Sequence, residues 1–186
     1  MIDCVHGAVI AQLEPPAGRQ FNGHGAFSSD GTRLYTSEVV AEGSEGRIGV
    51  WEVSTWRRIA EFASHGIGPH EILRLPDRED LVIANGGIQT DPSDRTPLNL
   101  ETMRPNLTYL RATGEVLDQV ELPGLAQNSI RHLSVRGDGL VGFAMQWQGD
   151  PFEAVPLLGL HRLGQTPQLC EPLLGEELAM KGYAGS

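Results

Sequence analysis

The sequence predicts an all-β fold and, within that class, a β-propeller. Short strand-forming segments separated by turn residues recur along the chain, and only "GEELAM" (residues 175–180) is expected to form a helical turn. A histidine opens the repeating unit three times, with 46 residues from His24 to His70 and 62 from His70 to His132. A four-stranded unit repeating at about 40–50 residues is typical of a propeller blade. A β-sandwich also contains short strands, but it does not repeat the same order of strand, turn and strand.

The first complete unit is expected over residues 24–62. The stretch "HGAFSSDGTRLYTSE" predicts two strands joined by a turn at Asp30 and Gly31, and "RIGVWEV" and "WRRIAEF" supply a third and a fourth strand. Residues 1–23 are expected to end another blade, with "MIDCVHGAVIAQLE" as its last hairpin.

Two more units are expected over residues 70–122 and 129–171, and residues 181–186 are expected to open a further blade. The stretches "HEILRLPDREDLVIAN" and "LTYLRATGEVLDQVEL" form one, and "IRHLSVRGDGLVGFAMQW" and "LLGLHRLGQTPQLC" form the other. The insert "GGIQTDPSDRTPLNLETMRPN" is interpreted as a rim loop, because it lacks the spacing of a calcium loop or a phosphate loop. Three blades do not close a ring, so we expect a larger protein or self-association through open flanks.

Composition limits the classes of function. The 186 residues are 40% apolar and 20% charged, which is typical of a globular domain. No apolar run reaches the roughly 20 residues that span a bilayer, and no export signal is expected. The net charge of −10 argues against a nucleic-acid partner. Cys4 and Cys170 lack the spacing of a thiolate metal site, and a single bridge between them stays an open alternative.

Several long stretches resemble one family, domain-of-unknown-function family 1513. They are "FNGHGAFSSDGTRLYTSE", "SHGIGPHEILRLPD", "LVIANGGIQT", "LNLETMRPNLTYL" and "SIRHLSVRGDGLVGFAMQWQGDP". The resemblance implies a periplasmic, seven-bladed bacterial propeller of unassigned activity, often encoded beside imelysin-like iron-uptake components. Members are about twice this length, so the chain corresponds to a central and C-terminal part. The resemblance carries over no catalytic residue.

The three histidines are the candidate site. Each lies near the start of the innermost strand of its blade, and inner strands line the central channel of a propeller. Three imidazoles at the channel mouth would bind zinc, copper or iron, or an anion when protonated. In the structural alternative, each histidine instead hydrogen-bonds a neighbouring blade or turn. Glu71 and Arg131 are expected to face away, because side chains alternate along a strand.

Other polar groups are candidates for ligand binding at the ends of strands. Glu38 and Asn85 end the second strands of their blades, where carboxylate and amide oxygens would suit calcium. Trp147 either contacts a ligand at the rim or anchors its loop. His65 is expected on a loop.

Two functions of different classes follow. One is a non-catalytic periplasmic protein for binding or scaffolding, linked to the acquisition of iron or another metal, and the other is a metal-dependent, lactonase-like hydrolase centred on the channel mouth. A divalent metal is the cofactor that both suggest. The absence of a Gly-x-Ser-x-Gly motif or a Ser-His-Asp set favours the first.

Overall fold

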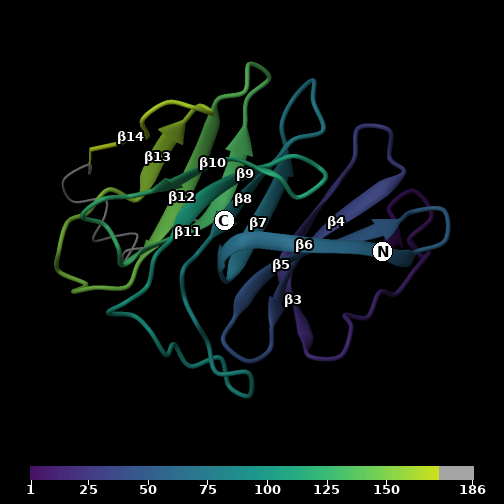
Figure 1. Cartoon of the computed structure of the whole chain (residues 1–186), viewed down its shortest axis with the longest axis horizontal. Helices are drawn as coiled ribbons and strands as arrows, with labels where there is room; N and C mark the ends of the chain where they lie inside the picture. Colours follow the sequence, from purple (N-terminus) through teal and green to yellow (C-terminus); the bar gives the residue numbers. More distant parts are fainter. Residues whose placement is uncertain (172–186) are drawn as a thin grey trace.

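The computed structural model describes residues 1–171, and this part of the chain is all-β (Figure 1). The helical turn expected at 175–180 and the blade start expected at 181–186 lie outside the described residues. Within residues 1–171, no helix has the length and apolar character needed to cross a membrane. Cys4 and Cys170 are both exposed and form no disulfide.

Three antiparallel four-stranded sheets follow one another along the chain, and we number them as blades 1 to 3. Blade 1 consists of β3 (Arg19–Phe27), β4 (Arg33–Val40), β5 (Glu45–Glu52) and β6 (Arg57–Ile67). Blade 2 consists of β7 (Pro69–Arg74), β8 (Leu81–Asn85), β9 (Asn106–Leu110) and β10 (Val116–Glu121). Blade 3 consists of β11 (Asn128–Val135), β12 (Val141–Trp147), β13 (Leu158–His161) and β14 (Gln168–Leu169). Within each sheet, every strand pairs with the next one in sequence, as in a propeller blade.

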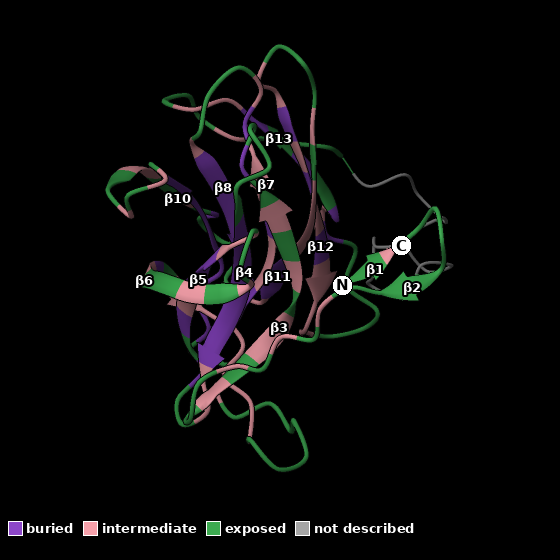
Figure 2. Ribbon diagram, turned by 90° about the vertical axis from the view of Figure 1, so that its right-hand side faces the viewer, coloured by how far each residue is buried: buried purple, intermediate pink, exposed green. Residues whose placement is uncertain are grey.

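A small hairpin precedes blade 1. It pairs β1 (Ile2–Asp3) with β2 (Ala8–Val9) and lies to one side of the three sheets in Figure 2. Blade 1 itself begins at Arg19, within the residues that the sequence assigned to the preceding blade.

The first strands of the three blades meet at the centre of the arc. Strand β7 packs against both β3 and β11, while the last strand of each blade lies at the opposite edge of its sheet. Figure 1 shows the three sheets arranged around these inner strands. The prediction of an all-β propeller arrangement is confirmed.

Apolar residues from adjacent blades fill the space between the sheets. Leu81 and Ile83 of β8 pack toward blade 1, whereas Val82 and Ala84 of the same strand pack toward blade 3. Alternate residues of a strand point to opposite faces of its sheet, so the five buried residues of β8 serve both interfaces. Figure 2 shows β8 buried along its length, whereas β6 consists mainly of exposed and half-buried residues. Blade 2 is therefore packed against blade 1 on one face and blade 3 on the other, and this packing holds its inner strand β7 in place.

The chain passes from blade 1 to blade 2 through a single residue, Gly68. Its φ is 57°, and a Cβ there would lie 2.9 Å from the carbonyl oxygen of Ile88, so glycine is required for conformation and for space. Pro69 then opens β7. His65 was expected on a loop, but it lies within the irregular end of β6, where its side chain is exposed.

The long insert forms the connection between β8 and β9 and folds back over blade 1. Thr90 pairs with Pro97 in an isolated bridge. The hydroxyl of Ser44, in the turn between β4 and β5, accepts a 3.0 Å hydrogen bond from the amide of Thr90. The loop is thereby anchored to the turn between β4 and β5 of blade 1.

Candidate metal centre

His24, His70 and His132 come together where the three inner strands meet. Their ring centroids are 5.0 Å apart for His24 and His70, 4.8 Å for His70 and His132, and 5.6 Å for His24 and His132. One ring nitrogen from each lies within 4.8 Å of the others. Within residues 1–171 this is the only group of three or more histidine, cysteine or acidic residues placed closely enough to hold a metal ion. The predicted convergence is present.

Each inner strand departs from regular pairing near its histidine. In β7, Pro69 pairs with Asn85 and Glu71 with Ala84, so His70 is an extra residue. In β11 the extra residue is Arg131, beside His132. In β3 the register shifts between Phe21 and Gly25, a segment that contains His24. Such bulges redirect side chains and interrupt the alternation of a strand.

Glu71 was expected to face away from the histidines, and this was wrong. Its Oε1 lies 3.6 Å from Nδ1 of His24, and its Oε2 lies 3.5 Å from Nδ1 of His132. Oε2 also accepts a 2.6 Å hydrogen bond from the backbone amide of Leu133. The bulge at His70 explains the error, because an inserted residue allows neighbouring side chains to reach the same space.

His70 has a buried ring nitrogen, Nδ1. Burial, aided by the positive charge of Arg131 and by the neighbouring histidines, lowers the pKa of His70 to about 3, although a hydrogen bond to the backbone of Arg131 opposes the shift. The ring is therefore neutral at pH 7. No partner among residues 1–171 reaches its buried Nδ1. A neutral imidazole with an unused nitrogen lone pair is the form that ligates metals.

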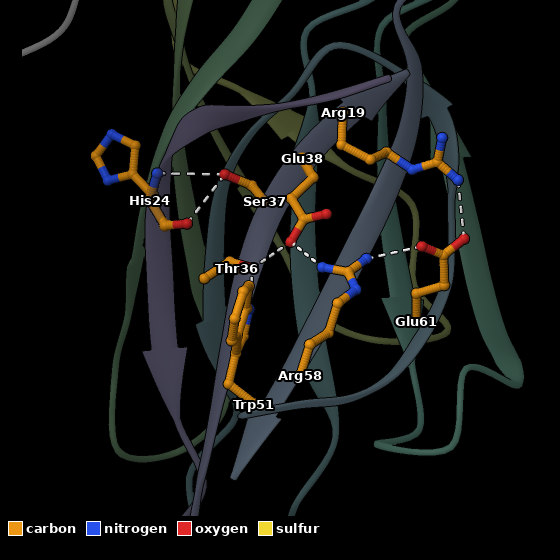
Figure 3. A network of polar contacts seen from close by, with 8 residues as sticks. All are labelled: Arg19, His24, Thr36, Ser37, Glu38, Trp51, Arg58 and Glu61. Atoms are coloured by element: carbon orange, nitrogen blue, oxygen red, sulfur yellow. Dashed lines mark hydrogen bonds and ion pairs between the residues drawn. The ribbon is translucent and has the colours of Figure 1, made fainter. Parts of the chain in front are cut away.

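Side chains from β3 and β4 connect the histidine-bearing strands. The hydroxyl of Ser37 accepts a hydrogen bond from the backbone amide of His24 at 3.2 Å and lies within hydrogen-bonding distance of the carbonyl oxygens of His24 and His70. The amide nitrogen of Asn22 donates to the carbonyl of Pro69 at 2.7 Å. In Figure 3, the imidazole of His24 points away from Ser37 and stands clear of the other labelled side chains. These contacts fix the backbones while leaving the ring accessible.

Glu38 belongs to a separate ionic network on the other side of Ser37 (Figure 3). Its carboxylate is fully buried, and Oε1 accepts hydrogen bonds from Thr36 at 2.7 Å and from Arg58 at 2.5 Å. Arg58 also pairs with Glu61, and hydrogen bonds to the two carboxylates raise the pKa of Arg58 despite its burial. Trp51 donates its indole N–H to Thr36. Glu38 therefore neutralises a cation inside blade 1, away from the histidines.

Asn85 and Trp147 also make their polar contacts elsewhere. The fully buried Asn85 donates to the backbone of Ser64 and to the side chains of Asn106 and Thr108, which joins blade 2 to the end of β6. Trp147 donates its indole N–H to the carbonyl of Asp150 at 2.9 Å, as the loop-anchoring alternative requires. Of the six candidate residues, only the three histidines come together.

The cluster supplies three nitrogen ligands and leaves other coordination positions open. Zinc–nitrogen bonds of 2.0–2.1 Å place tetrahedral ligand atoms roughly 3.3 Å apart, so the imidazoles need to close by at most about 1.5 Å. His24 is 34% exposed and His132 20% exposed, which leaves room for that adjustment. Three protein ligands with an open position are typical of catalytic or exchangeable sites rather than of closed structural ones.

A family model described as "Protein of unknown function (DUF1513)" matches residues 1–186. The chain belongs to this family. No curated protein matches the sequence.

Solved structures resemble the chain in fold. A protein from Lactobacillus plantarum is 16% identical, with a TM-score of 0.54 over 91% of this chain and 46% of its own. Hydrazine synthase from Kuenenia stuttgartiensis is 12% identical, with a TM-score of 0.51 over 92% and 59%. The Dos1 propeller is 8% identical, with a TM-score of 0.50 over 81% and 32%. The chain thus spans less than two thirds of each of these structures, and at such identities the likeness concerns the fold alone.

Proposed function

We propose that this member of the DUF1513 family is a non-catalytic binding protein for a divalent transition-metal ion, which His24, His70 and His132 hold at the channel mouth. The observation that carries the proposal is the convergence of three imidazoles from three blades, with ring nitrogens within 4.8 Å of one another. Imidazole suits zinc, copper and iron, whereas calcium and magnesium prefer oxygen ligands.

Glu71 supports this function because its position beside two of the imidazoles determines which ring nitrogen of each faces the metal. A histidine that binds a metal donates its other ring N–H to a carboxylate or a carbonyl, which fixes the orientation of the ring. With Nδ1 of His24 and of His132 directed at Glu71, each ring presents Nε2 to the metal. His70 presents its unpartnered Nδ1. Glu71 is then a positioning residue rather than a ligand.

Cobalt titration tests the proposal, because Co²⁺ replaces zinc or iron in nitrogen sites and its visible absorption reports the coordination. The purified chain is expected to bind one equivalent of Co²⁺. His70→Ala should weaken binding by more than about 100-fold, since even loss of a hydrogen-bond partner outside the ligand set costs 10–100-fold. His65→Ala is the matched control, because His65 is exposed and makes no contact within the cluster.

The structural alternative makes a different prediction for the same variant. If His70 serves only the fold, His70→Ala should lower stability by about 1–3 kcal/mol, the cost of leaving buried groups unpaired, without changing the affinity for Co²⁺. Circular dichroism and urea unfolding of wild type and variant separate the two cases. Failure of the wild-type chain to bind Co²⁺, Zn²⁺ and Cu²⁺ would rule out the metal centre.

The family resemblance supports placing this activity in the periplasm, in the acquisition of iron or another metal. Fractionation of cells that produce the full-length protein, followed by immunoblotting, tests the compartment. Growth of a deletion strain under limitation of iron, zinc or copper tests the physiological role, and a defect rescued by wild type but not by His70→Ala would connect that role to the cluster.

Self-association through the flanks of the three-blade arc is a further part of the proposal. A hollow of about 620 Å³ lies between the β1–β2 hairpin and blade 1, and one of about 490 Å³ lies on the outer side of blade 3. Phe27 is 43% exposed and Leu158 is 47% exposed on these flanks. Sedimentation should therefore show dimers or larger species, and a stable monomer at low concentration would contradict this part.

A metal-dependent hydrolase is the second candidate, and the open coordination position favours it. A metal held by three histidines can bind and activate water. Hydrolysis of simple lactones by zinc-loaded protein, lost in His70→Ala, would establish this function in place of the non-catalytic one.

A further inference from the structure

A chain of polar contacts leads from the long loop of blade 2 to the strands that carry the histidines. The loop covers residues 86–105, between β8 and β9. Within it, Arg95 donates from Nη2 to the side-chain oxygen of Asn22 at 3.3 Å. The side-chain nitrogen of Asn22 in turn donates to the backbone carbonyl of Pro69 at 2.7 Å. Asn22 therefore joins the loop to β3 and to β7.

Both ends of the contact between Asn22 and Pro69 lie next to a histidine of the cluster. Asn22 is two residues before His24, and Pro69 directly precedes His70. Residues 22–24 form no ladder pair with β4, because the register shifts there. Gly23, with a φ of 117°, adds a conformation that other residues rarely adopt. The position of His24 therefore depends on side-chain contacts more than on the sheet.

The loop presents Arg95 from a fixed turn. The amide of Arg95 donates to the carbonyl of Asp91 at 2.9 Å, and the amide of Thr90 donates to the hydroxyl of Ser44 in blade 1 at 3.0 Å. Arg95 itself has a φ of 64°, in the left-handed region that residues other than glycine seldom occupy. Such strained residues persist where the surrounding structure holds them, and they gather at functional sites.

We infer that Asn22 and Arg95 are positioning residues of the metal centre, through which the 86–105 loop sets the position of His24 relative to His70. This inference rests on the metal centre proposed above. The ring centroids of His24 and His70 are 5.0 Å apart, and metal ligation requires the imidazoles to approach one another. A small displacement of the segment that carries His24 therefore changes the affinity for the metal.

Arg95→Ala tests the inference in the Co²⁺ titration, because position and charge act in opposite directions. Removal of a positive charge near a cation site would tighten binding if charge alone mattered. Loss of the contact with Asn22 should instead weaken binding by about tenfold, the lower end of the range for residues that orient metal ligands.

Asn22→Asp separates the two contacts of Asn22. Aspartate keeps an oxygen that accepts from Arg95, but it has no N–H group to donate to Pro69. Its negative charge, two residues from His24, would by itself attract Co²⁺. The inference predicts weaker binding by about 10–100-fold and, in both variants, an altered visible spectrum of bound Co²⁺, because the ligand geometry changes.

Arg104→Ala is the matched control, since Arg104 is another exposed arginine of the same loop. It should bind Co²⁺ as the wild type does. Arg95 is also exposed, so Arg95→Ala should unfold at the urea concentration of the wild type. A lower unfolding midpoint with an unchanged Co²⁺ spectrum would show a general loss of stability and overturn the inference.

The two proposals fail in different ways. A wild-type chain that binds no Co²⁺ contradicts the metal centre. Binding that depends on His70 but is unchanged or tighter in Arg95→Ala and Asn22→Asp leaves the metal centre in place and overturns the positioning role. In the metal-free chain, nuclear magnetic resonance should show that Arg95→Ala shifts the imidazole proton signals of His24 but not those of exposed His65. Absence of that shift would overturn the inference whether or not the chain binds Co²⁺.

Discussion

Replacement of Arg58 by methionine should destabilise blade 1 by about 3 kcal/mol. The variant removes the cation that faces Glu38, whose side chain is 0% exposed, while methionine retains most of the apolar stem. Removal of one partner of a buried ion pair costs about 3–5 kcal/mol, because the other charge stays buried. Arg58 itself is 16% exposed, and Thr36 still donates to the carboxylate, so the lower end of this range applies.

A double-mutant cycle separates the cost of leaving the Glu38 carboxylate buried without a cation from the cost of losing the other contacts of Arg58. Glu38→Met together with Arg58→Met removes both members of the buried ion pair, so the double variant should be more stable than Arg58→Met alone. Arg58 also lies 5.6 Å from the ring centroid of Trp51, a contact that contributes at most about 2 kcal/mol and is lost in both variants.

The assay is urea unfolding followed by far-ultraviolet circular dichroism. Tryptophan fluorescence is less suitable, because the substitution itself changes the surroundings of Trp51 and so changes the signal of the folded state. For a chain of this size, 3 kcal/mol corresponds to a fall in Tm of roughly 6–12 °C. A loss below about 1 kcal/mol, the range of exposed ion pairs, would refute the buried-charge reasoning. The reasoning would also be refuted if the changes in the free energy of unfolding caused by Glu38→Met and Arg58→Met simply added in the double variant.

Three further predictions follow from the site and its supports. Glu71→Gln should weaken Co²⁺ binding about 10–100-fold in the titration, because the neutral amide offers one acceptor oxygen and no negative charge to the two nearby imidazoles. An unchanged affinity would contradict the positioning role. Ser37→Ala should lower the free energy of unfolding by about 1–3 kcal/mol in urea, since it leaves the partly buried backbone amide of His24 without its acceptor. Gly49→Ala should cost about 1–3 kcal/mol, because its Cβ would overlap Oε1 of Glu38, whereas Gly137→Ala, with open space around it, should be nearly neutral in the same assay.

The fold was predictable because its signals are local. The Asp30-Gly31 turn, the apolar run at 81–85 and the repeated order of strands each follow from a few neighbouring residues. The convergence of His24, His70 and His132 was also predictable, because equivalent positions in successive blades point to the same axis.

The residues that complete the site were not predictable in the same way. Glu71 depends on a bulge that changes the direction of its side chain, and a β-bulge leaves no regular mark in a single sequence. Glu38 was placed with the candidate ligands because the sequence predicted it at the end of a strand. In the structure β4 continues to Val40, and the ionic partner of Glu38, Arg58, lies two strands away. Pairing between distant residues requires the structure.

The bulges connect the architecture with the chemistry of the site. An inserted residue interrupts the ladder of hydrogen bonds, and each buried backbone group it releases needs another partner. Ser37 accepts from the amide of His24, Asn22 donates to the carbonyl of Pro69, and Glu71 accepts from the amide of Leu133. The side chains that replace the missing ladder bonds thus join the three blades, and Glu71 also orients two of the imidazoles. All three register shifts lie at or beside a histidine of the cluster, so the irregular backbone is explained by the cluster that it positions.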